Sequence, residues 1–529
     1  MSLPSDLSTD QPEAEPASTP AYNQHIVTTA KGGGVLIVGR IFEYGGRLVL
    51  AFLLARLLGA EQFGLYTLGL TVATIAATIA IMGMDDGMMR FIAIYARQRD
   101  TNRLWGTMIF CLGTTTIMSV LLMVLLFSLA EPLATVIFHN ESLILMLRLT
   151  SLLVPFLALS EMLKFAARGF KMMHYNVIAE NLVQTPIRIV LLAILGIVGL
   201  TPYMAVAVFG LSDICASIVL FYLINKKFSL RRSLRSGQFN ARHIFSFSFP
   251  LWIADLLSTF RSNIQTVLLG SLSTLTSVGV FTVVGRVNLF GHMSYQSLIA
   301  SVKPTIAELQ ATNEWKNLER LYQTTSRWGL TLNLPVFLLI VMYPRQILSI
   351  FGDSYESGVT ALIVLACAEL VNVATGICGS IIDMTGHNRI KLFNSFSIVV
   401  ISIGTNLLLI PPYGVMGAAV AAFISIALIN LMRLIEVWYL YRILPYNREF
   451  LKPVLAGLFA LAAIWLTSNW LDGQDAIVFM LVQGLVVLSV YLGSIWLLGL
   501  SPDDRVIVDR VNRKTTALYT QGRAILKLR

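Results

Sequence analysis

The chain has 529 residues, of which 56% are hydrophobic and 13% are charged, with a mean hydropathy of +0.73. Soluble domains typically contain about 25% charged residues, so this composition excludes an ordinary soluble protein. The net charge of +10 comes from basic residues in short segments between long apolar runs. This distribution is typical of the cytoplasmic loops of a membrane protein and argues against nucleic-acid binding.

Apolar runs of roughly 20 residues predict membrane-spanning helices along most of the chain. Residues 1–31 are rich in Ser, Thr, Pro, Ala and acidic residues, and we expect a disordered cytoplasmic tail there rather than a cleaved signal peptide. An N-terminal lobe of six spans is expected over residues 32–225. Its spans are predicted at 32–56, 62–83, 104–129, 145–167 and 177–200, followed by a sixth that ends near residue 224.

The second half begins after a basic linker, residues 226–243, which carries six Lys and Arg residues. A C-terminal lobe of six spans is expected over residues 244–441, and helices 13 and 14 over residues 442–500. The spans are predicted at 244–269, 278–302, 328–342, 359–382, 392–410, 415–439, 454–470 and 476–498. A basic cytoplasmic tail, residues 501–529, ends the chain.

The connecting loops alternate between basic and neutral. The loop after the second span carries Arg90, Arg97, Arg99 and Arg103, whereas residues 131–141 contain no Lys or Arg. Because basic loops stay in the cytoplasm, the alternation favours an even number of spans, with both termini cytoplasmic. The expected fold class is therefore an all-α polytopic membrane protein with about 14 transmembrane helices.

The two halves contain similar segments in the same order. Gly64-Leu65-Tyr66-Thr67-Leu68 opens the second span, and Gly279-Val280-Phe281-Thr282-Val283 opens the eighth. Turns at Thr201-Pro202-Tyr203 and Pro411-Pro412-Tyr413 join the fifth to the sixth and the eleventh to the twelfth spans. An even number of crossings separates equivalent helices, so the halves are predicted to be parallel repeats, a known plan for transporters.

Two segments carry a family resemblance. ARLLGAEQFGLYTLGL, residues 55–70, and LLLIPPYGVMGAAVA, residues 407–421, resemble signatures of polysaccharide transporters of the multidrug/oligosaccharidyl-lipid/polysaccharide flippase superfamily. The resemblance covers about residues 32–441. It implies two six-helix lobes in a V-shaped arrangement with two further C-terminal helices. It also implies a flippase that moves an undecaprenyl-diphosphate-linked oligosaccharide (an O-antigen, capsule or exopolysaccharide repeat unit) across the bacterial inner membrane by alternating access, coupled to an ion gradient.

Arginines inside the apolar runs are the candidate substrate-binding residues. A diphosphate that crosses a low-dielectric layer needs compensating charge, which guanidinium groups supply by bidentate hydrogen bonding. The candidates lie in the first two helices of each half, which face the cleft in the family: Arg40, Arg47, Arg261 and Arg286. Arg47 and Arg261 occupy comparable places in the two halves and are expected to act together on the diphosphate. The alternatives are a structural salt bridge between Arg40 and Glu43, and an Arg286 side chain that extends to the membrane interface.

Coupling to protons or sodium requires a carboxylate within the membrane. The candidates are Glu43, Asp255, Asp213 and Glu369. Glu43 could instead neutralise Arg47, four residues further on, and Asp213 and Glu369 could form polar contacts between helices.

Other chemistries have no signature in the sequence. There is no GxxxxGK[ST] phosphate loop, no His/Cys cluster with metal spacing and no long outer loop for an active site, so we expect no enzyme, cofactor or metal centre. Membrane lipids and other polysaccharide assembly proteins are the expected partners. Three alternatives remain open: a small-molecule or drug exporter of the same superfamily, a membrane polysaccharide polymerase or ligase, and a non-transporting scaffold.

Overall fold

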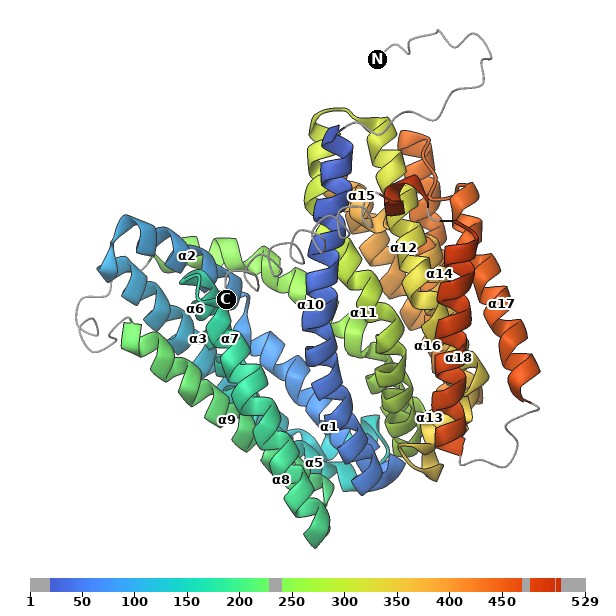
Figure 1. Ribbon diagram of the computed structural model, residues 1–529. Helices are drawn as coiled ribbons and strands as arrows, with labels where there is room; N and C mark the ends of the chain where they lie inside the picture. Colours follow the sequence, from blue (N-terminus) through green and yellow to red (C-terminus); the bar gives the residue numbers. More distant parts are fainter. Residues whose placement is uncertain (1–19, 228–239, 469–475, 500, 506–529) are drawn as a thin grey trace, which may run out of the picture.

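The computed structural model describes residues 20–227, 240–468, 476–499 and 501–505 (Figure 1). Side chains are described from Tyr44 onward, and every regular element within these ranges is a helix. The first half contains α1 Pro20–Ile81, α2 Met84–Gln98, α3 Thr101–Ser128, α4 Ala130–Pro132, η1 Leu133–Ile137, α5 Ser142–Ser151, α6 Val154–Gly169, α7 Met173–Val177, η2 Ile178–Gln184, α8 Thr185–Val198 and α9 Pro202–Lys227. The second half contains α10 Ala241–Leu272, α11 Leu275–Ala311, α12 Trp315–Met342, α13 Pro344–Ser349, η4 Asp353–Gly358, α14 Val359–Ala374, α15 Cys378–Met384, α16 Asn388–Tyr441, η5 Arg448–Phe450, α17 Leu451–Ser468 and α18 Ala476–Leu497.

The predicted all-α polytopic class is confirmed. Within the described ranges, nine helices are long and apolar enough to cross a membrane, and the bent pair α5–α6 forms a tenth candidate. Two of the nine, α1 and α16, are each divided by a glycine with positive φ, Gly59 (φ 72°) and Gly414 (φ 51°), where the sequence predicts turns between spans. Helices α10 and α11, predicted as spans seven and eight, fall outside that apolar set. The count of 14 is compatible with these helices and stays a prediction.

Two segments differ from the expected layout. Helix α1 begins at Pro20, inside the segment predicted to be a disordered tail, while residues 1–19 lie outside the described residues. Helix α2 occupies most of the segment expected to be a basic loop. Met84, Met88, Phe91 and Ile92 recur at helical spacing and are buried, so α2 is an amphipathic helix whose arginines lie on another face.

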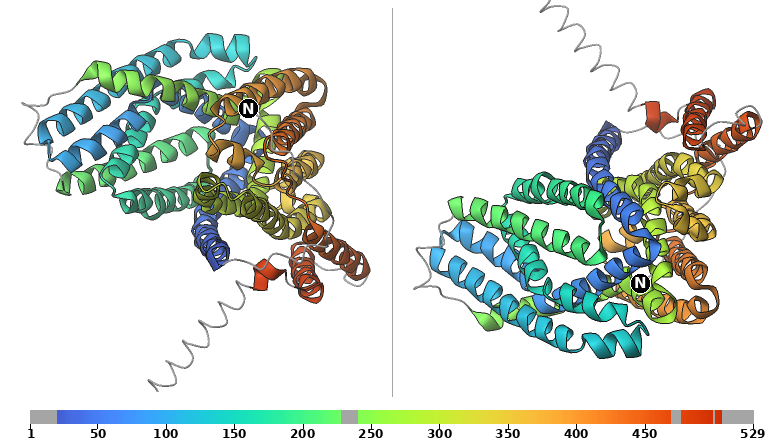
Figure 2. Two further views of the ribbon diagram at one scale, coloured as in Figure 1. Left: turned by 90° about the horizontal axis from the view of Figure 1, so that it is seen from above. Right: turned by 90° about the horizontal axis from the view of Figure 1, so that it is seen from below.

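The helices form two arms that converge at one end. In Figure 1, α2–α9 lean to one side and α11–α18 stand on the other, and both further views in Figure 2 separate the same two groups. The arms meet where the second segment of α1 packs against the start of α11. There, a methyl group added at Gly64 would overlap the carbonyl oxygen of Leu275, and one added at Gly279 would overlap that of Ala60. The two glycines of the repeated motif therefore let two helix backbones touch.

Helix α10 also contacts the first arm near its own N-terminus. Gly83 and Gly87 of the α2 region lie directly against Ser248, and a side chain at either glycine would overlap that serine. The Phe91 ring lies 6.0 Å from the ring of Phe247. Near its other end, α10 packs Gly270 against Leu68 of α1. Helix α10 also packs against α11 and α16 of the second arm, so it bridges the two arms.

A cluster of charged residues, which we call the α12 clamp, fixes the segment after α18 to α12. Arg327 donates to both carboxylate oxygens of Asp504, at 2.6 and 2.9 Å, and to the hydroxyl of Ser501 at 2.7 Å. The Trp328 indole donates to Asp504 at 2.8 Å, and Thr324 donates to Asp503 at 2.6 Å. Because Arg327 is only 6% exposed, the clamp satisfies a cation that would otherwise be buried without a partner.

The clamp gives a first prediction. Asp504→Asn is expected to lower the free energy of unfolding by about 1–3 kcal/mol, since the charged hydrogen bonds to Arg327 become neutral ones. Burial raises the pKa of Asp504, but its hydrogen bonds to Arg327 and the charge of Arg327 outweigh burial, so the pKa is lowered. Because the pKa of Asp504 is lower in the folded than in the unfolded protein, its ionised carboxylate stabilises the fold at pH values above the unfolded pKa, about 3.9. This stabilisation is lost as the pH falls through the folded pKa.

Thermal melting of the detergent-solubilised protein checks this expectation. The gap in melting temperature between the wild type and Asp504→Asn should be constant from pH 8 to pH 5 and should shrink below about pH 4. Asp353→Asn, at an exposed position in η4, is the control and should melt like the wild type. A gap that closes already between pH 7 and pH 6 would contradict the assignment to Asp504.

Candidate functional site

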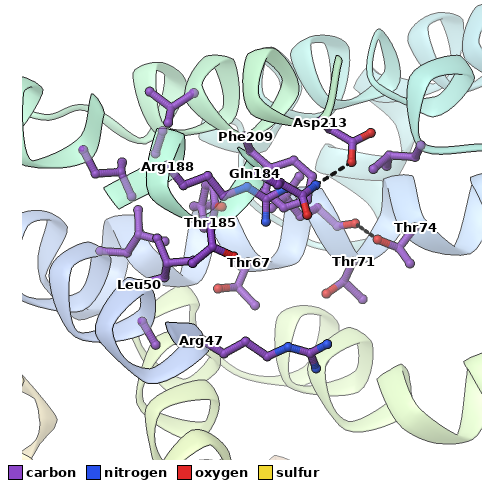
Figure 3. Close-up of a pocket in the computed structure, with 18 of the residues that line it drawn as sticks. Arg47, Leu50, Thr67, Thr71, Thr74, Gln184, Thr185, Arg188, Phe209 and Asp213 are labelled. Atoms are coloured by element: carbon purple, nitrogen blue, oxygen red, sulfur yellow. Dashed lines mark hydrogen bonds between the residues drawn. The ribbon is translucent and has the colours of Figure 1, made fainter. Parts of the chain in front are cut away.

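The first candidate site, cavity 1, is a space of about 480 Å³ in the first arm. Cavity 1 is surrounded by both segments of α1 and by α6, η2, α8 and α9, and α10 and α11 contribute Asn263, Thr282 and Arg286 from the other half. Figure 3 shows Arg188, Gln184 and Asp213 on one side, Thr67, Thr71 and Thr74 on the α1 side, and Arg47 across from them. Residues from both halves of the chain therefore meet in this cavity.

Three arginines line cavity 1, and we call them the arginine cluster: Arg47, Arg188 and Arg286. Electrostatic interactions link Arg47 with each of the other two. Within the described residues, no carboxylate lies within 4.0 Å of Arg188 or Arg286. Asp213 and Glu180 interact electrostatically with Arg188 and compensate part of this positive charge. An anion or water in the cavity can compensate the rest.

Arg188 is held in place by neutral groups. Its Nε donates to the Ser212 hydroxyl at 2.7 Å, and its guanidinium carbon lies 3.9 Å from the centroid of the Phe209 ring. Its Nη2 is buried without a hydrogen-bond partner in the protein. One edge of this guanidinium is therefore fixed, while an N–H donor beside the cavity is left for a ligand.

A lysine and three carboxylates also line cavity 1. Lys164 lies 3.2 Å from Glu161 and 2.9 Å from Glu180. Asp213, 4% exposed, accepts hydrogen bonds through Oδ1 from Gln184 at 2.7 Å and Ser160 at 3.3 Å, and its Oδ2 is buried without a partner. An almost buried carboxylate with one unused oxygen can take up a proton or contribute one ligand to a cation.

A π-helical turn supplies two of these groups. η2 spans Ile178–Gln184, and both Glu180 and Gln184 line the cavity from it. The Thr185 hydroxyl donates to the Glu180 carbonyl at 3.0 Å, a bond across five residues that fits the wider turn. Single π-turns within α-helices occur frequently at functional sites, because they redirect side chains.

The second candidate site, cavity 2, measures about 810 Å³ and lies in the second arm. It is formed by α10, α11, α14, α15 and α16. Its charged residues include Arg261, Arg433, Lys303 and an ion pair between Lys391 and Asp383 at 3.3 Å. Four amide side chains line it as well: Gln296, Asn372, Asn394 and Asn430.

Cavity 2 also holds a chain of hydrogen bonds around a buried carboxylate. The Nδ1 atom of His292 lies 2.9 Å from Oε1 of Glu369, and its Nε2 lies 2.8 Å from the Gln296 amide nitrogen. Asn372 donates to the same Glu369 oxygen at 3.3 Å and accepts from Asn430 at 3.1 Å. Glu369 is thus held by an imidazole and an amide, an arrangement that suits the transfer of a proton.

The structure separates the residues singled out from the sequence. Arg47, Arg286 and Asp213 meet in cavity 1, whereas Arg261 and Glu369 lie in cavity 2. The side chains of Arg40 and Glu43 lie outside the described residues. Asp255 lines neither cavity, and Asp86 of α2 interacts with it electrostatically. In this conformation, the expected joint action of Arg47 and Arg261 on one diphosphate is therefore not supported, because they line different cavities.

Several charged residues of the cavities were not singled out from the sequence. Arg188 and Arg433 lie inside apolar runs, as Arg47 does, so the same criterion would have found them. They were missed because candidates were restricted to the first two helices of each half. Lys164 also lies inside an apolar run, three residues after Glu161, and was missed because only arginines and carboxylates were considered. His292 carries no such signal, since only the fold brings Glu369 beside it.

Comparisons with known proteins agree with this architecture. A family model described as polysaccharide biosynthesis protein matches residues 29–310, and the MatE model matches residues 250–408. The probable flippase AglR of Haloferax volcanii is 27% identical over 46% of this chain and 50% of its own length. The capsular polysaccharide biosynthesis protein CapF of Staphylococcus aureus is 23% identical over 43% of this chain and 56% of its own. The chain thus spans about half the length of these curated relatives.

Solved structures share the fold. The lipid II flippase MurJ in an inward closed conformation superposes with a TM-score of 0.66 at 16% identity, over 87% of this chain and 98% of its own. An inward-facing multidrug resistance MATE family transporter of the MOP superfamily gives 0.62 at 17% identity, over 74% and 92%. At these identities, the superpositions establish a common architecture.

Proposed function

The chain belongs to the polysaccharide biosynthesis protein family, and from this premise we propose that it is a flippase for a lipid-linked oligosaccharide. Its cargo is an undecaprenyl-diphosphate-linked repeat unit of an O-antigen, capsule or exopolysaccharide. The arginine cluster carries the proposal, because three guanidinium groups beside one cavity match the charge and hydrogen-bonding capacity of a diphosphate. A cation exporter would instead need an acidic site.

The remaining expectations are part of this proposal. This multi-pass membrane protein lies in the bacterial inner membrane with both termini in the cytoplasm, as the loop charges predict. Arg40, whose side chain is outside the described part, stays a candidate substrate-binding residue from the sequence. The N-terminal lobe, basic linker, C-terminal lobe, last two helices and terminal tails are the six proposed parts of the chain. Two lobes that meet through Gly64 and Gly279 can rock about that contact to alternate access.

Ion coupling is assigned to carboxylates within the lobes. Asp213 and Glu369 have the supporting geometry, one with an unused buried oxygen and the other with a histidine at 2.9 Å. Glu43 and Asp255 remain candidates from the sequence. Proton binding and cargo binding can be linked only if each ligand binds the two conformations of the protein with different affinity.

Transport by the purified full chain in proteoliposomes tests the function. The probe is undecaprenyl diphosphate carrying a disaccharide, loaded in one leaflet and detected from the other with an impermeant enzyme that modifies its sugar. Accumulation should exceed that in empty liposomes and should rise with an imposed pH or sodium gradient. In the double variant Asp213→Asn and Glu369→Gln, transport should no longer follow the gradient.

Three other results would contradict the proposal or part of it. No transport of this probe under any gradient, together with export of an organic cation such as ethidium, would replace the flippase with a drug exporter. A longer saccharide product without movement between leaflets would indicate a polymerase. Transport that follows the gradient unchanged in the double variant would remove both carboxylates from coupling.

A further inference from the structure

Cavity 2 contains a pair of arginines that the diphosphate site does not use. Arg261 reaches it from α10 and Arg433 from α16, and the two guanidinium groups interact electrostatically. In the part of the chain that the structure describes, neither has a carboxylate within 4.0 Å, whereas the neighbouring Lys391 is paired with Asp383. Glu436, three residues after Arg433 on α16, interacts with Arg433 electrostatically from a greater distance. Two like charges on different helices repel each other unless an anion lies between them.

The fold holds one of these groups in place. Arg433 lies against the backbone of α15, where a methyl group added at Gly379 would come within 3.2 Å of its Nη1. A side chain at position 379 would therefore push the guanidinium away by a few tenths of an ångström. Arg261 comes from α10, the helix that bridges the two arms, so its distance from Arg433 depends on how the arms are arranged.

The rest of the lining suits a ligand rich in hydroxyl groups. Asn394 is 2% exposed and donates to Glu436 at 2.7 Å, but its Oδ1 is buried without a partner. Asn372, Asn430 and Gln296 add further amide donors and acceptors. Amides serve as donor and acceptor at once, which matches the dual character of a sugar hydroxyl. At about 810 Å³, cavity 2 is larger than cavity 1.

We propose that cavity 2 holds the glycan part of the cargo and that the Arg261–Arg433 pair binds a carboxylate of an acidic sugar in it. This inference rests on the proposed flippase function and narrows its substrate class to repeat units that contain a uronic acid. The two charged parts of the cargo differ in charge and therefore bind in different cavities. The diphosphate meets the three-arginine cluster in cavity 1, and a single carboxylate meets the two-arginine pair in cavity 2.

Binding to a matched pair of lipid-linked saccharides tests the inference. Both probes are prenyl diphosphate disaccharides, one ending in glucuronic acid and the other in glucose, added to the full chain in nanodiscs of zwitterionic lipid. The wild type should bind the acidic probe about tenfold or more tightly, as expected for an added charge-assisted hydrogen bond. Arg261→Met and Arg433→Met should each bind both probes equally.

Four further variants distinguish the two cavities and control for misfolding. Arg188→Met in cavity 1 should weaken both probes by the same factor and leave their ratio unchanged. Arg433→Lys keeps the charge and should retain part of the preference, whereas Gly379→Ala should reduce it without removing the arginine. Arg345→Met, an exposed cation on α13 outside both cavities, should behave as the wild type.

Each other outcome overturns the inference in a distinct way. A preference that persists in Arg261→Met and Arg433→Met would place the acid-binding groups elsewhere. Equal weakening of both probes in those variants would mean that the pair binds the diphosphate. Loss of the wild-type preference when phosphatidylglycerol is added to the nanodiscs would assign the pair to a lipid headgroup. If neither probe bound the wild type at all, the proposed function itself would fail.

Discussion

Arg188→Met is expected to lower the initial rate of lipid-linked oligosaccharide transport by about 10- to 100-fold, the range for losing one hydrogen bond to a charged group. Arg188 offers a buried, unpartnered Nη2 and is oriented by Ser212 and Phe209, so its position does not depend on a bound ligand. Arg286→Met should have a similar effect. The diphosphate would then meet fewer compensating charges in a poorly solvated space.

Conservative and control variants make this result specific. Arg188→Lys keeps the charge but loses the planar fork, so transport should fall only partly. Arg345→Met should transport at the wild-type rate. Proteoliposome assays at matched protein amounts give the rates, and a wild-type rate in both Arg188→Met and Arg286→Met would reject the cluster as the diphosphate site.

Arg47 requires a separate test, because Glu43 lies four residues before it in the sequence. If Arg47 binds the diphosphate, Arg47→Ala should transport poorly whatever stands at position 43. If it serves only to neutralise Glu43, the pair Arg47→Ala with Glu43→Ala should restore the rate. Recovery in that charge-neutral pair would remove Arg47 from the substrate site.

Gly64→Ala is expected to disrupt the contact between the two arms. The added methyl would overlap the Leu275 carbonyl oxygen, and a backbone group cannot rotate out of the way as a side chain can. Overpacking of this kind typically destabilises a packed state by about 1–3 kcal/mol. Because the overlap exists only where α1 and α11 touch, the variant should favour a conformation in which these helix ends are apart, and transport should nearly stop.

Spin labels report this shift directly. Cysteines at positions 141 and 345 place one label on each arm, in a background without the four native cysteines, and electron paramagnetic resonance measures their separation. Gly64→Ala should lengthen it. Gly285→Ala is a matched control on α11, where an added methyl meets nothing within 4 Å, and should leave it unchanged. Identical distances in Gly64→Ala and the wild type, with normal transport, would contradict a role for the close contact between α1 and α11 in holding the two arms together.

Hydropathy and local geometry made much of the fold predictable from the sequence. Apolar runs of bilayer length force helices, because unpaired backbone groups are not tolerated in lipid. Pro411, Pro412 and Gly414 mark the break in α16, and Gly59 marks the break in α1. The charged α2 was misjudged because its arginines suggested a loop, although its apolar residues recur at helical spacing.

The sequence could not predict which residues line which cavity. Arg47 and Arg261 occupy equivalent places in the two halves of the sequence, yet they line different cavities. Arg286 joins Arg47 because Gly64 and Gly279 let α1 and α11 touch, and this contact brings residues more than 200 positions apart to one cavity.

The sequence by itself determined that this protein is a helical membrane protein with charged residues inside its spans, because both properties follow from the local order of apolar and polar side chains. Only the tertiary structure decided which of those charges meet. Lys164 with Glu180 and His292 with Glu369 are pairs between different helices, and Arg188 and Arg286 line one cavity from different helices. Such pairs depend on helix crossing and rotation, which packing between side chains sets and which no local pattern records.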